Sequence, residues 1–228
     1  LHQVATDADP GGGKIRALSE SADLLQRLDQ LVEIGVALSS ERDIDKLLES
    51  ILVAAKSITN ADGGTLYRML EGGRDLKFEI VRNDSLGIAM GGTSGVPIPF
   101  HPVHLYDGEG KPVNSMVAAY AVHHDCSVNV ADAYTEKGFD FSGTRRFDEK
   151  TGYRSRSFLT IPIKNHEAEI IGVLQLINAK DRARDAVRAF SEADQRLAES
   201  LASQAAIALT NRLLINHLEA LFESFIKV

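Results

Sequence analysis

The chain has 228 residues, of which 44% are hydrophobic and 25% are charged, a composition typical of a globular protein large enough to bury one core. Its formal net charge of −7 argues against nucleic acid as a partner, because phosphate backbones are contacted mainly through Lys and Arg. No apolar run approaches the roughly 18 residues of a membrane span, and the single cysteine, Cys126, fits a cytoplasmic protein without an internal disulfide.

The N-terminal part is predicted to be a linker followed by two helices. Residues 1–13 close with an Asp-Pro-Gly-Gly-Gly run and are expected to form a flexible linker. Residues 14–40 are expected to form a signalling helix, because apolar residues recur at gaps of four and three as far as Leu38. Ser39 and Ser40 are expected to break this helix and cap a second one over about 42–58.

The middle of the chain alternates short strands with loops. Two strands, 65–70 and 76–82, flank a Glu-Gly-Gly turn and predict a hairpin. The Gly- and Pro-containing stretch 84–113 is expected to be mostly loop, with a short strand at about 96–100. A helix is predicted over 114–123, a strand over 127–130 and a short helix or turn over 132–138. The polar, aromatic stretch 139–156 is expected to be an ordered loop over a site.

Two apolar strands and a long helix complete the predicted domain. The strands cover 158–164 and 169–178, and a charged loop at 181–188 leads to a helix that Ser191 and Asp194 begin with a capping box. Short turns between strands favour an α+β fold with a central antiparallel sheet of about six strands. We expect the terminal helices on one face and a pocket covered by loop and helix on the other. The domain is placed at 41–210, with a linker helix at 211–228.

Four motifs between residues 129 and 178 carry a family resemblance. They are, in chain order, Asn129-Val130-Ala131-Asp132-Ala133-Tyr134, Phe147-Asp148-Glu149-Lys150-Thr151-Gly152-Tyr153-Arg154-Ser155-Arg156-Ser157, Ile161-Pro162-Ile163-Lys164 and Ile170-Ile171-Gly172-Val173-Leu174-Gln175-Leu176-Ile177-Asn178. Together they resemble the GAF domains of cyclic-nucleotide phosphodiesterases and bacterial adenylyl cyclases, over roughly residues 30–213. The resemblance implies a sensory, regulatory domain that binds a small ligand, with a cyclic nucleotide as one candidate, and is not itself an enzyme.

The end of the chain carries a second resemblance. Residues 218–228 are similar to the segment that enters the HD or HD-GYP phosphohydrolase domain of bacterial signalling proteins. This implies an output domain beyond Val228, in a parent protein of the metal-dependent, cyclic-dinucleotide phosphodiesterase class. The chain itself holds no HD metal-binding motif, so we expect neither catalytic residues nor a metal site in it.

The first resemblance also implies a set of ligand-binding positions. Backbone groups at Val117 and Ala118, at the start of a helix, would contact a cyclic phosphate, as helix N-termini do. Further positions in the covering loop and the last strand of the sheet are implied by alignment or by local charge. These are Asp148, Thr151, Arg154, Ser155 and Gln175.

The family's Asn-Lys-Phe-Asp-Glu signature is kept in part. Asn178 and Asp194 match it, whereas the Lys, Phe and Glu positions hold other residues. Lys180, one register over, is expected to reach Asp194 in place of the family's lysine.

An apolar stripe on the last helix predicts a dimer. Beyond Asn211 the sheet should have ended, so the stripe needs another partner, and a parallel homodimer seam with Gln204 and Asn211 setting the register is favoured. The seam residues are Asn211, Ile215, Leu218, Phe222 and Phe225.

Three other groups of residues allow alternative interpretations. The His residues at 101, 104, 123 and 124 favour loop packing over metal binding, because their spacing lacks a helical i, i+4 pair. Cys126 is favoured as a small apolar residue over a reactive or chromophore-bearing thiol. The arginines at 145, 146, 154 and 156 fit equally an anion site and ion pairs with the acids at 140, 148 and 149.

Two functional hypotheses follow from these features. The first is a regulatory module whose ligand orders the 139–156 segment and shifts the terminal helices, which pass the signal to an output domain. The alternative is a dimerisation and spacer module with a vestigial pocket.

Overall fold

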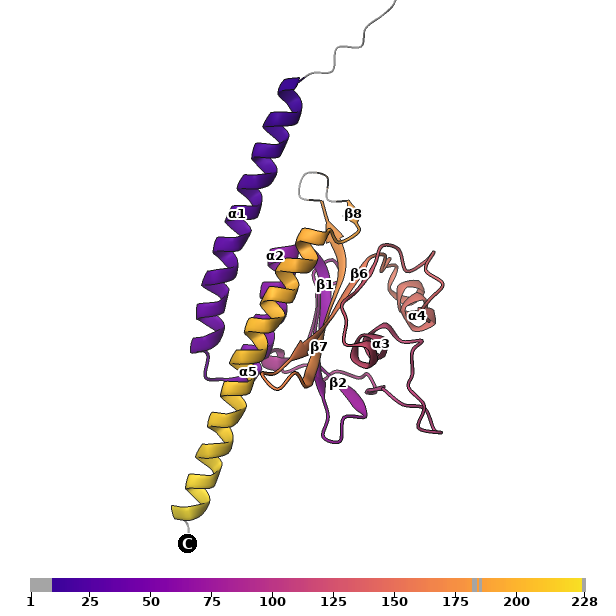
Figure 1. The fold of residues 1–228 in the computed structure, drawn as a ribbon. Helices are drawn as coiled ribbons and strands as arrows, with labels where there is room; N and C mark the ends of the chain where they lie inside the picture. The colour runs from indigo at the N-terminus through magenta and orange to yellow at the C-terminus, as the bar shows by residue number, and fades with distance from the viewer. Residues whose placement is uncertain (1–9, 182–183, 185, 227–228) are drawn as a thin grey trace, which may run out of the picture.

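The computed structural model describes residues 10–181, 184 and 186–226, and within them the strands form one antiparallel sheet (Figure 1). Along the sheet the order is β3-β2-β1-β7-β6-β5, while β4 pairs with β2 and β8 with β7. The strands are β1 (Ala61–Met69), β2 (Asp75–Asn83), β3 (Ile88–Gly91), β4 (Val103–His104), β5 (Val128–Val130), β6 (Phe158–Lys164), β7 (Ile170–Lys180) and β8 (Val187–Arg188).

Helices cover both faces of this sheet. The helical elements are α1 (Pro10–Ser40), α2 (Ile44–Thr59), the 3₁₀ turn η1 (Gly92–Ser94), α3 (Val117–His124), α4 (Ser142–Thr151) and α5 (Glu192–Ile226). Figure 1 shows α2 and α5 against one face, α1 lying outside α5, and α3 and α4 on the opposite face. The expected α+β architecture, with an antiparallel sheet and the terminal helices on one face, is confirmed.

The largest apolar core lies between the sheet and the α2–α5 layer. Side chains such as Leu47, Ile51, Leu66 and Leu201 are 1% exposed or less. Two smaller clusters lie under α3 and beside α4, one around Tyr67 and the other around Phe158. Because both sheet faces are covered, the strands β1, β6 and β7 are buried almost along their whole length.

The N-terminal elements differ from the sequence prediction at their boundaries. Helix α1 begins at Pro10, inside the stretch expected as linker, and proline is tolerated in a first helical turn because its missing N–H would be unpaired there. Residues 1–9 of that expected linker lie outside the described residues. The N-cap of α2 is Asp43, whose carboxylate accepts from the N–H groups of Asp45 and Lys46, whereas Ser39 and Ser40 belong to the last turn of α1.

Two predictions in the middle of the chain are wrong. The expected strand at 96–100 does not form, because Pro97 and Pro99 lack the N–H that a ladder needs, and the stretch 84–113 forms β3 and β4 instead. The expected loop at 139–156 contains helix α4, whose N-cap is Phe141; just before it, the Asp140 carboxylate accepts from Ser142 N at 2.8 Å. This helix was missed because its sequence is polar and its only large apolar residue is Phe147.

Helices α1 and α5 run parallel and touch at two levels (Figure 1). Arg27 of α1 pairs with Asp194 at the start of α5, and further along Gly35 lies against Gln204. A Cβ on Gly35 would lie 2.1 Å from Gln204 Oε1, so only glycine permits this approach without displacing the glutamine. Gln204 therefore packs against α1 of its own chain, and its expected role in setting a dimer register stays a prediction.

Candidate ligand pocket

A small cavity lies between the sheet and α4, on the face away from α2 and α5. Its volume is about 150 Å³. Strands β1, β2, β6 and β7 supply its floor, and α4 with the segment that follows it supplies the roof. It is lined by Gly64, Thr65, Val81, Arg82, Asn83, Ile88, Met90, Phe100, Thr144, Phe147, Tyr153, Ser155, Phe158, Gln175 and Ile177.

The floor carries a hydrogen-bonded amide, Gln175, on β7. Its neighbours across the sheet are Thr65 on β1 and Thr160 on β6. Gln175 Nε2 donates to Thr160 Oγ1 at 3.0 Å, and Gln175 Oε1 accepts from the Tyr67 hydroxyl at 3.3 Å. Burial raises the pKa of Tyr67, so its hydroxyl stays protonated and remains a donor. The amide is thereby held in one orientation at the cavity.

The roof is anchored by Asp148, which is 3% exposed on α4. Its carboxylate accepts from the Tyr134 hydroxyl at 2.7 Å and from both the N–H and the hydroxyl of Ser155 at 2.8 Å. The hydrogen bond to Asp148 is the largest cause of the raised pKa of Tyr134. Asp148 therefore ties α4 to the turn before it and to the segment entering β6, and its oxygens are engaged within the protein.

Asn178, at the end of β7, holds the segment between α4 and β6. Its Oδ1 accepts from the N–H groups of Arg156 at 2.7 Å and Ser157 at 3.2 Å. Its Nδ2 donates to the Tyr153 hydroxyl at 2.9 Å and to Arg154 O at 2.8 Å. The residue has a left-handed backbone with φ of 57°, which asparagine adopts more readily than most residues. One side chain thus fixes the backbone next to the cavity.

A second polar group joins this segment to β1. The Tyr153 hydroxyl donates to Asp62 at 2.5 Å, and Asp62 also accepts from Ser85 at 2.8 Å and pairs with Lys180 at 2.7 Å. Burial alone would raise the pKa of Asp62, but these three partners outweigh it and the pKa is lowered. Lys180 thus forms its ion pair with Asp62, not with Asp194 as expected.

Asp194 is fully buried at the start of α5 and makes the predicted capping box. Ser191 N donates to its carboxylate at 2.8 Å, and Asp194 N donates to Ser191 Oγ at 3.1 Å. The carboxylate also pairs with Arg27 and, at 2.6 Å, with Arg188. Burial would raise the pKa of Asp194, yet the hydrogen bonds from Arg188, Ser191 and Arg27 together lower it. The two cations occupy the place expected for Lys180.

The other residues implied by the resemblance lie away from the cavity lining. Val117 and Ala118 are buried in the apolar clusters under α3. Thr151 is exposed and its hydroxyl donates to Phe147 O within α4. Arg154 stacks on the Tyr134 ring at 4.2 Å from its centroid. Of the seven implied positions, Ser155 and Gln175 line the cavity.

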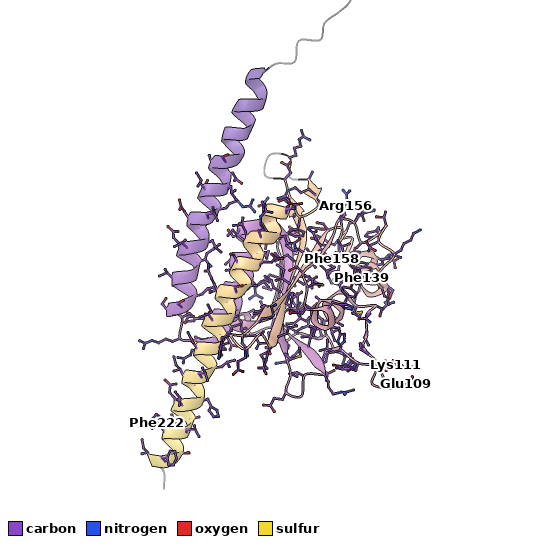
Figure 2. The ribbon with its side chains drawn as sticks, viewed as in Figure 1. Glu109, Lys111, Phe139, Arg156, Phe158 and Phe222 are labelled. Atoms are coloured by element: carbon purple, nitrogen blue, oxygen red, sulfur yellow. The ribbon has the colours of Figure 1, made fainter. Side chains whose placement is uncertain are left out.

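Several lining residues escaped the sequence analysis. Tyr153 lies in the second of the four motifs, between Thr151 and Ser155, which the resemblance implied as ligand-binding positions. Its large aromatic ring was the feature that could have pointed to it. Asn83 and Phe100 come from segments that only the tertiary fold brings to the cavity. Phe158 lies in the sheet near Phe139 and the helices of that face (Figure 2).

Three of the four arginines and three of the four histidines singled out by the sequence have protein partners, Arg146 and His101 being the others. Arg145 and Arg154 flank the Tyr134 ring, and Arg156 pairs with Asp132 at 3.1 Å. His104 Nδ1 lies 2.6 Å from Asp75, His123 Nε2 lies 2.6 Å from the carbonyl oxygen of Leu105, and the His124 ring stacks on Tyr120. Within the described residues, no three His, Cys, Asp or Glu side chains cluster as metal ligands would.

The projecting part of α5 exposes the expected seam. The exposed fractions are 45% for Ile215, 53% for Leu218, 66% for Phe222 and 76% for Phe225, and Asn211 is also exposed. Figure 2 shows Phe222 on the length of helix that extends beyond the sheet. Among the described helices, none is long and apolar enough to cross a lipid bilayer.

Comparison with known proteins identifies the domain. The family model described as GAF domain matches residues 43–209. The chain is 28% identical over 181 residues to the dual 3',5'-cyclic-AMP and -GMP phosphodiesterase 11A of Takifugu rubripes, covering 79% of this chain and 18% of that protein. It therefore spans less than a fifth of this relative's length.

Solved structures share the fold. The GAF domain of an Acinetobacter phosphoenolpyruvate-protein phosphotransferase has a TM-score of 0.59 at 16% identity, covering 84% of this chain and 98% of that one. A GAF domain/HD domain protein from Geobacter sulfurreducens has a TM-score of 0.52 at 15% identity, covering 78% and 98%. At these identities the likeness concerns the fold alone.

Proposed function

The chain belongs to the GAF domain family, and from that premise we propose that it binds a small ligand under α4 and transmits the bound state through α1 and α5. GAF domains are regulatory rather than catalytic, and the relative from Takifugu rubripes is a cyclic-nucleotide phosphodiesterase. A cyclic nucleotide is accordingly one candidate ligand. The proposal needs a physical connection between the cavity and the terminal helices.

One chain of polar contacts carries this proposal. Asn178 holds the N–H of Ser157 beside the cavity, and the Ser157 hydroxyl donates to Arg188 O at 2.7 Å. Arg188 in turn pairs with Asp194, which also binds Arg27 of α1. A shift of the segment between α4 and β6 would therefore reach the start of α5 and the middle of α1 through directly contacting groups.

Coupling through this series of polar contacts has a thermodynamic condition. The ligand must bind two arrangements of the terminal helices with different affinity, because equal affinity shifts no equilibrium. Contacts of the ligand with Ser155 and Tyr153, whose backbone belongs to the moving segment, would provide that difference.

The terminal helices are proposed to form a parallel homodimer. Besides the seam on α5, apolar side chains of α1 face outward, with exposed fractions of 63% for Leu25, 66% for Val32 and 69% for Val36. A continuous apolar face along helices that run the same way is what a parallel bundle buries. In this proposal α5 continues into a downstream domain, for which the resemblance of residues 218–228 suggests an HD-type phosphohydrolase. The Geobacter sulfurreducens neighbour is itself described as a GAF domain/HD domain protein.

Removing residues 212–228 should weaken dimerisation of the chain. Light scattering over a dilution series should give a dimer mass for the full chain and a monomer mass for the truncated one. Phe222→Glu should act like the truncation, while Ala220→Glu, off the seam on the same helix, should leave the mass unchanged. Equal masses for the full and truncated chains would remove the dimer from the proposal.

A spacer module with a vestigial pocket is the alternative function. The small volume of the cavity favours it, because ligand pockets for drug-sized molecules have about 300–1,000 Å³. Calorimetric titration with cyclic mononucleotides, cyclic dinucleotides and small uncharged compounds separates the two functions. Binding accompanied by a change in spin-label distance between the α1 helices of a dimer supports the regulatory module, and binding without that change contradicts it.

A further inference from the structure

We propose that the cavity under α4 takes an uncharged, single-ring ligand with an amide-like hydrogen-bonding group, rather than a nucleotide phosphate. This inference rests on the proposed function, since it names the chemical class of that same ligand. Three properties of the cavity carry it: its volume, the charge of its lining, and the kind of side chain that surrounds it.

The volume sets the size of the ligand. A cavity of about 150 Å³ engineered into another protein holds a benzene molecule, and the cavity here has about the same volume. A cyclic nucleotide adds a sugar, a phosphate and a second ring to such a body. The cavity therefore matches one ring with a small substituent.

The lining offers no charge for a phosphate. Among the described lining residues the only ionisable side chain besides Tyr153 is Arg82. Successive side chains of a strand point to opposite faces, so Arg82 on β2 points to one face of the sheet and its neighbours Val81 and Asn83 point to the other. The Arg82 guanidinium donates to Glu49 of α2 at 2.7 Å and to Met90 O at 2.8 Å. Its charge is thus paired on the far side of the sheet, and burying an unpaired anion in the cavity would be strongly unfavourable.

Two cations of the roof are also turned away. Arg145 and Arg154 stack on Tyr134 outside the cavity lining, as described above. The N-terminus of α3, expected as the phosphate site, begins at Val117, which is buried among Phe141 and Phe158. Neither group reaches a ligand in the cavity.

The lining instead suits a ring with a polar substituent. Phe100, Phe147, Tyr153 and Phe158 bring four aromatic rings to a small space, and such rings pack well against another ring. Gln175 has two N–H donors, of which one is given to Thr160. An amide or lactam on the ligand can pair with this carboxamide and with the Ser155 and Thr65 hydroxyls beside it.

Nicotinamide and nicotinate have nearly the same shape, so comparing their affinities tests whether the ligand must be uncharged. At pH 7.5 the two differ by a full negative charge on the same ring. Isothermal titration of the full chain should show nicotinamide, benzamide or uracil binding with one site per chain, and nicotinamide binding at least tenfold more tightly than nicotinate. Cyclic GMP should bind more weakly than the uncharged compounds.

A pair of variants on α4 locates the site. Thr144→Phe fills the cavity from its half-buried edge and should abolish binding, while Ser142→Phe, exposed on the same helix, should preserve it. Circular dichroism before titration establishes that each variant is folded. If Thr144→Phe fails to fold, Gln175→Leu replaces it and should lower affinity for nicotinamide at least tenfold.

The outcomes separate this inference from the proposed function. Cyclic GMP or nicotinate binding as tightly as nicotinamide overturns the ligand class and leaves the regulatory function standing. Failure of all the uncharged compounds at millimolar concentration also overturns the ligand class. Failure of every probe, cyclic nucleotides and dinucleotides included, overturns the regulatory function as well and favours the spacer module.

Discussion

Replacing Asp194 by alanine tests whether its buried carboxylate joins α1 to the domain. The substitution removes the carboxylate half of the capping box of α5 and takes from Arg27, whose side chain is 10% exposed, its close carboxylate partner, leaving it only the carboxylate contact with Asp23 at 3.7 Å. Removing one partner of a buried ion pair costs about 3–5 kcal/mol, and losing a helix cap costs about 1 kcal/mol. Arg188 is 35% exposed and can be solvated, so Arg27 accounts for most of the loss. We expect the free energy of unfolding to fall by about 4 kcal/mol.

Urea denaturation followed by circular dichroism measures this change. With a slope of about 2 kcal/mol per molar urea, the midpoint should move down by about 2 M. Glu192→Ala is the control, because that side chain lies in the same first turn but is 92% exposed, and its loss should change stability by less than about 0.5 kcal/mol.

A double-variant cycle sharpens the test. Arg27→Ala with Asp194→Ala should cost less than the sum of the single losses, because the second substitution removes a charge that the first has already left unpaired. Additive losses, or a midpoint for Asp194→Ala within 0.5 M of the control, would refute the argument that this pair anchors α1.

Two further predictions concern the polar groups around the cavity. Asn178→Ala should lower the free energy of unfolding by about 3 kcal/mol, because it loses the side-chain hydrogen bonds and strains the left-handed backbone. Asn178→Gly should recover about 1 kcal/mol of this loss, because glycine relieves the strain but not the lost hydrogen bonds. Equal losses for the two variants in urea denaturation would contradict the strain argument. Asp62 and Asp194 have pKa values that folding lowers below the ordinary aspartate pKa near 3.9. Their ionised carboxylates therefore stabilise the fold fully at pH values above about 3.9, and this stabilisation is lost as the pH falls through their lowered pKa values in the folded state. Melting temperature should therefore drop steeply below about pH 4 in the parent chain and less steeply in Asp194→Asn.

The order of elements was predictable because each leaves a local pattern. Alternating residues around the Glu-Gly-Gly turn predicted the β1–β2 hairpin, and Ser191 with Asp194 predicted the start of α5, as the structure shows. Helix α4 left no such pattern, because tertiary contacts hold it: Asp148 binds Tyr134 and Ser155, and Phe147 faces the cavity.

The sequence by itself determined the fold class, the family and the apolar stripe of the last helix, because hydrophobic periodicity, turn residues and short motifs are local properties of the chain. Which charges pair with which was decided only by the tertiary structure. Lys180 lies beside Asp62, and Asp194 lies beside Arg27, which is 167 positions away. The character of the cavity was likewise decided in three dimensions, because Asn83, Phe147 and Gln175 meet there only after the sheet has formed and α4 has closed over it.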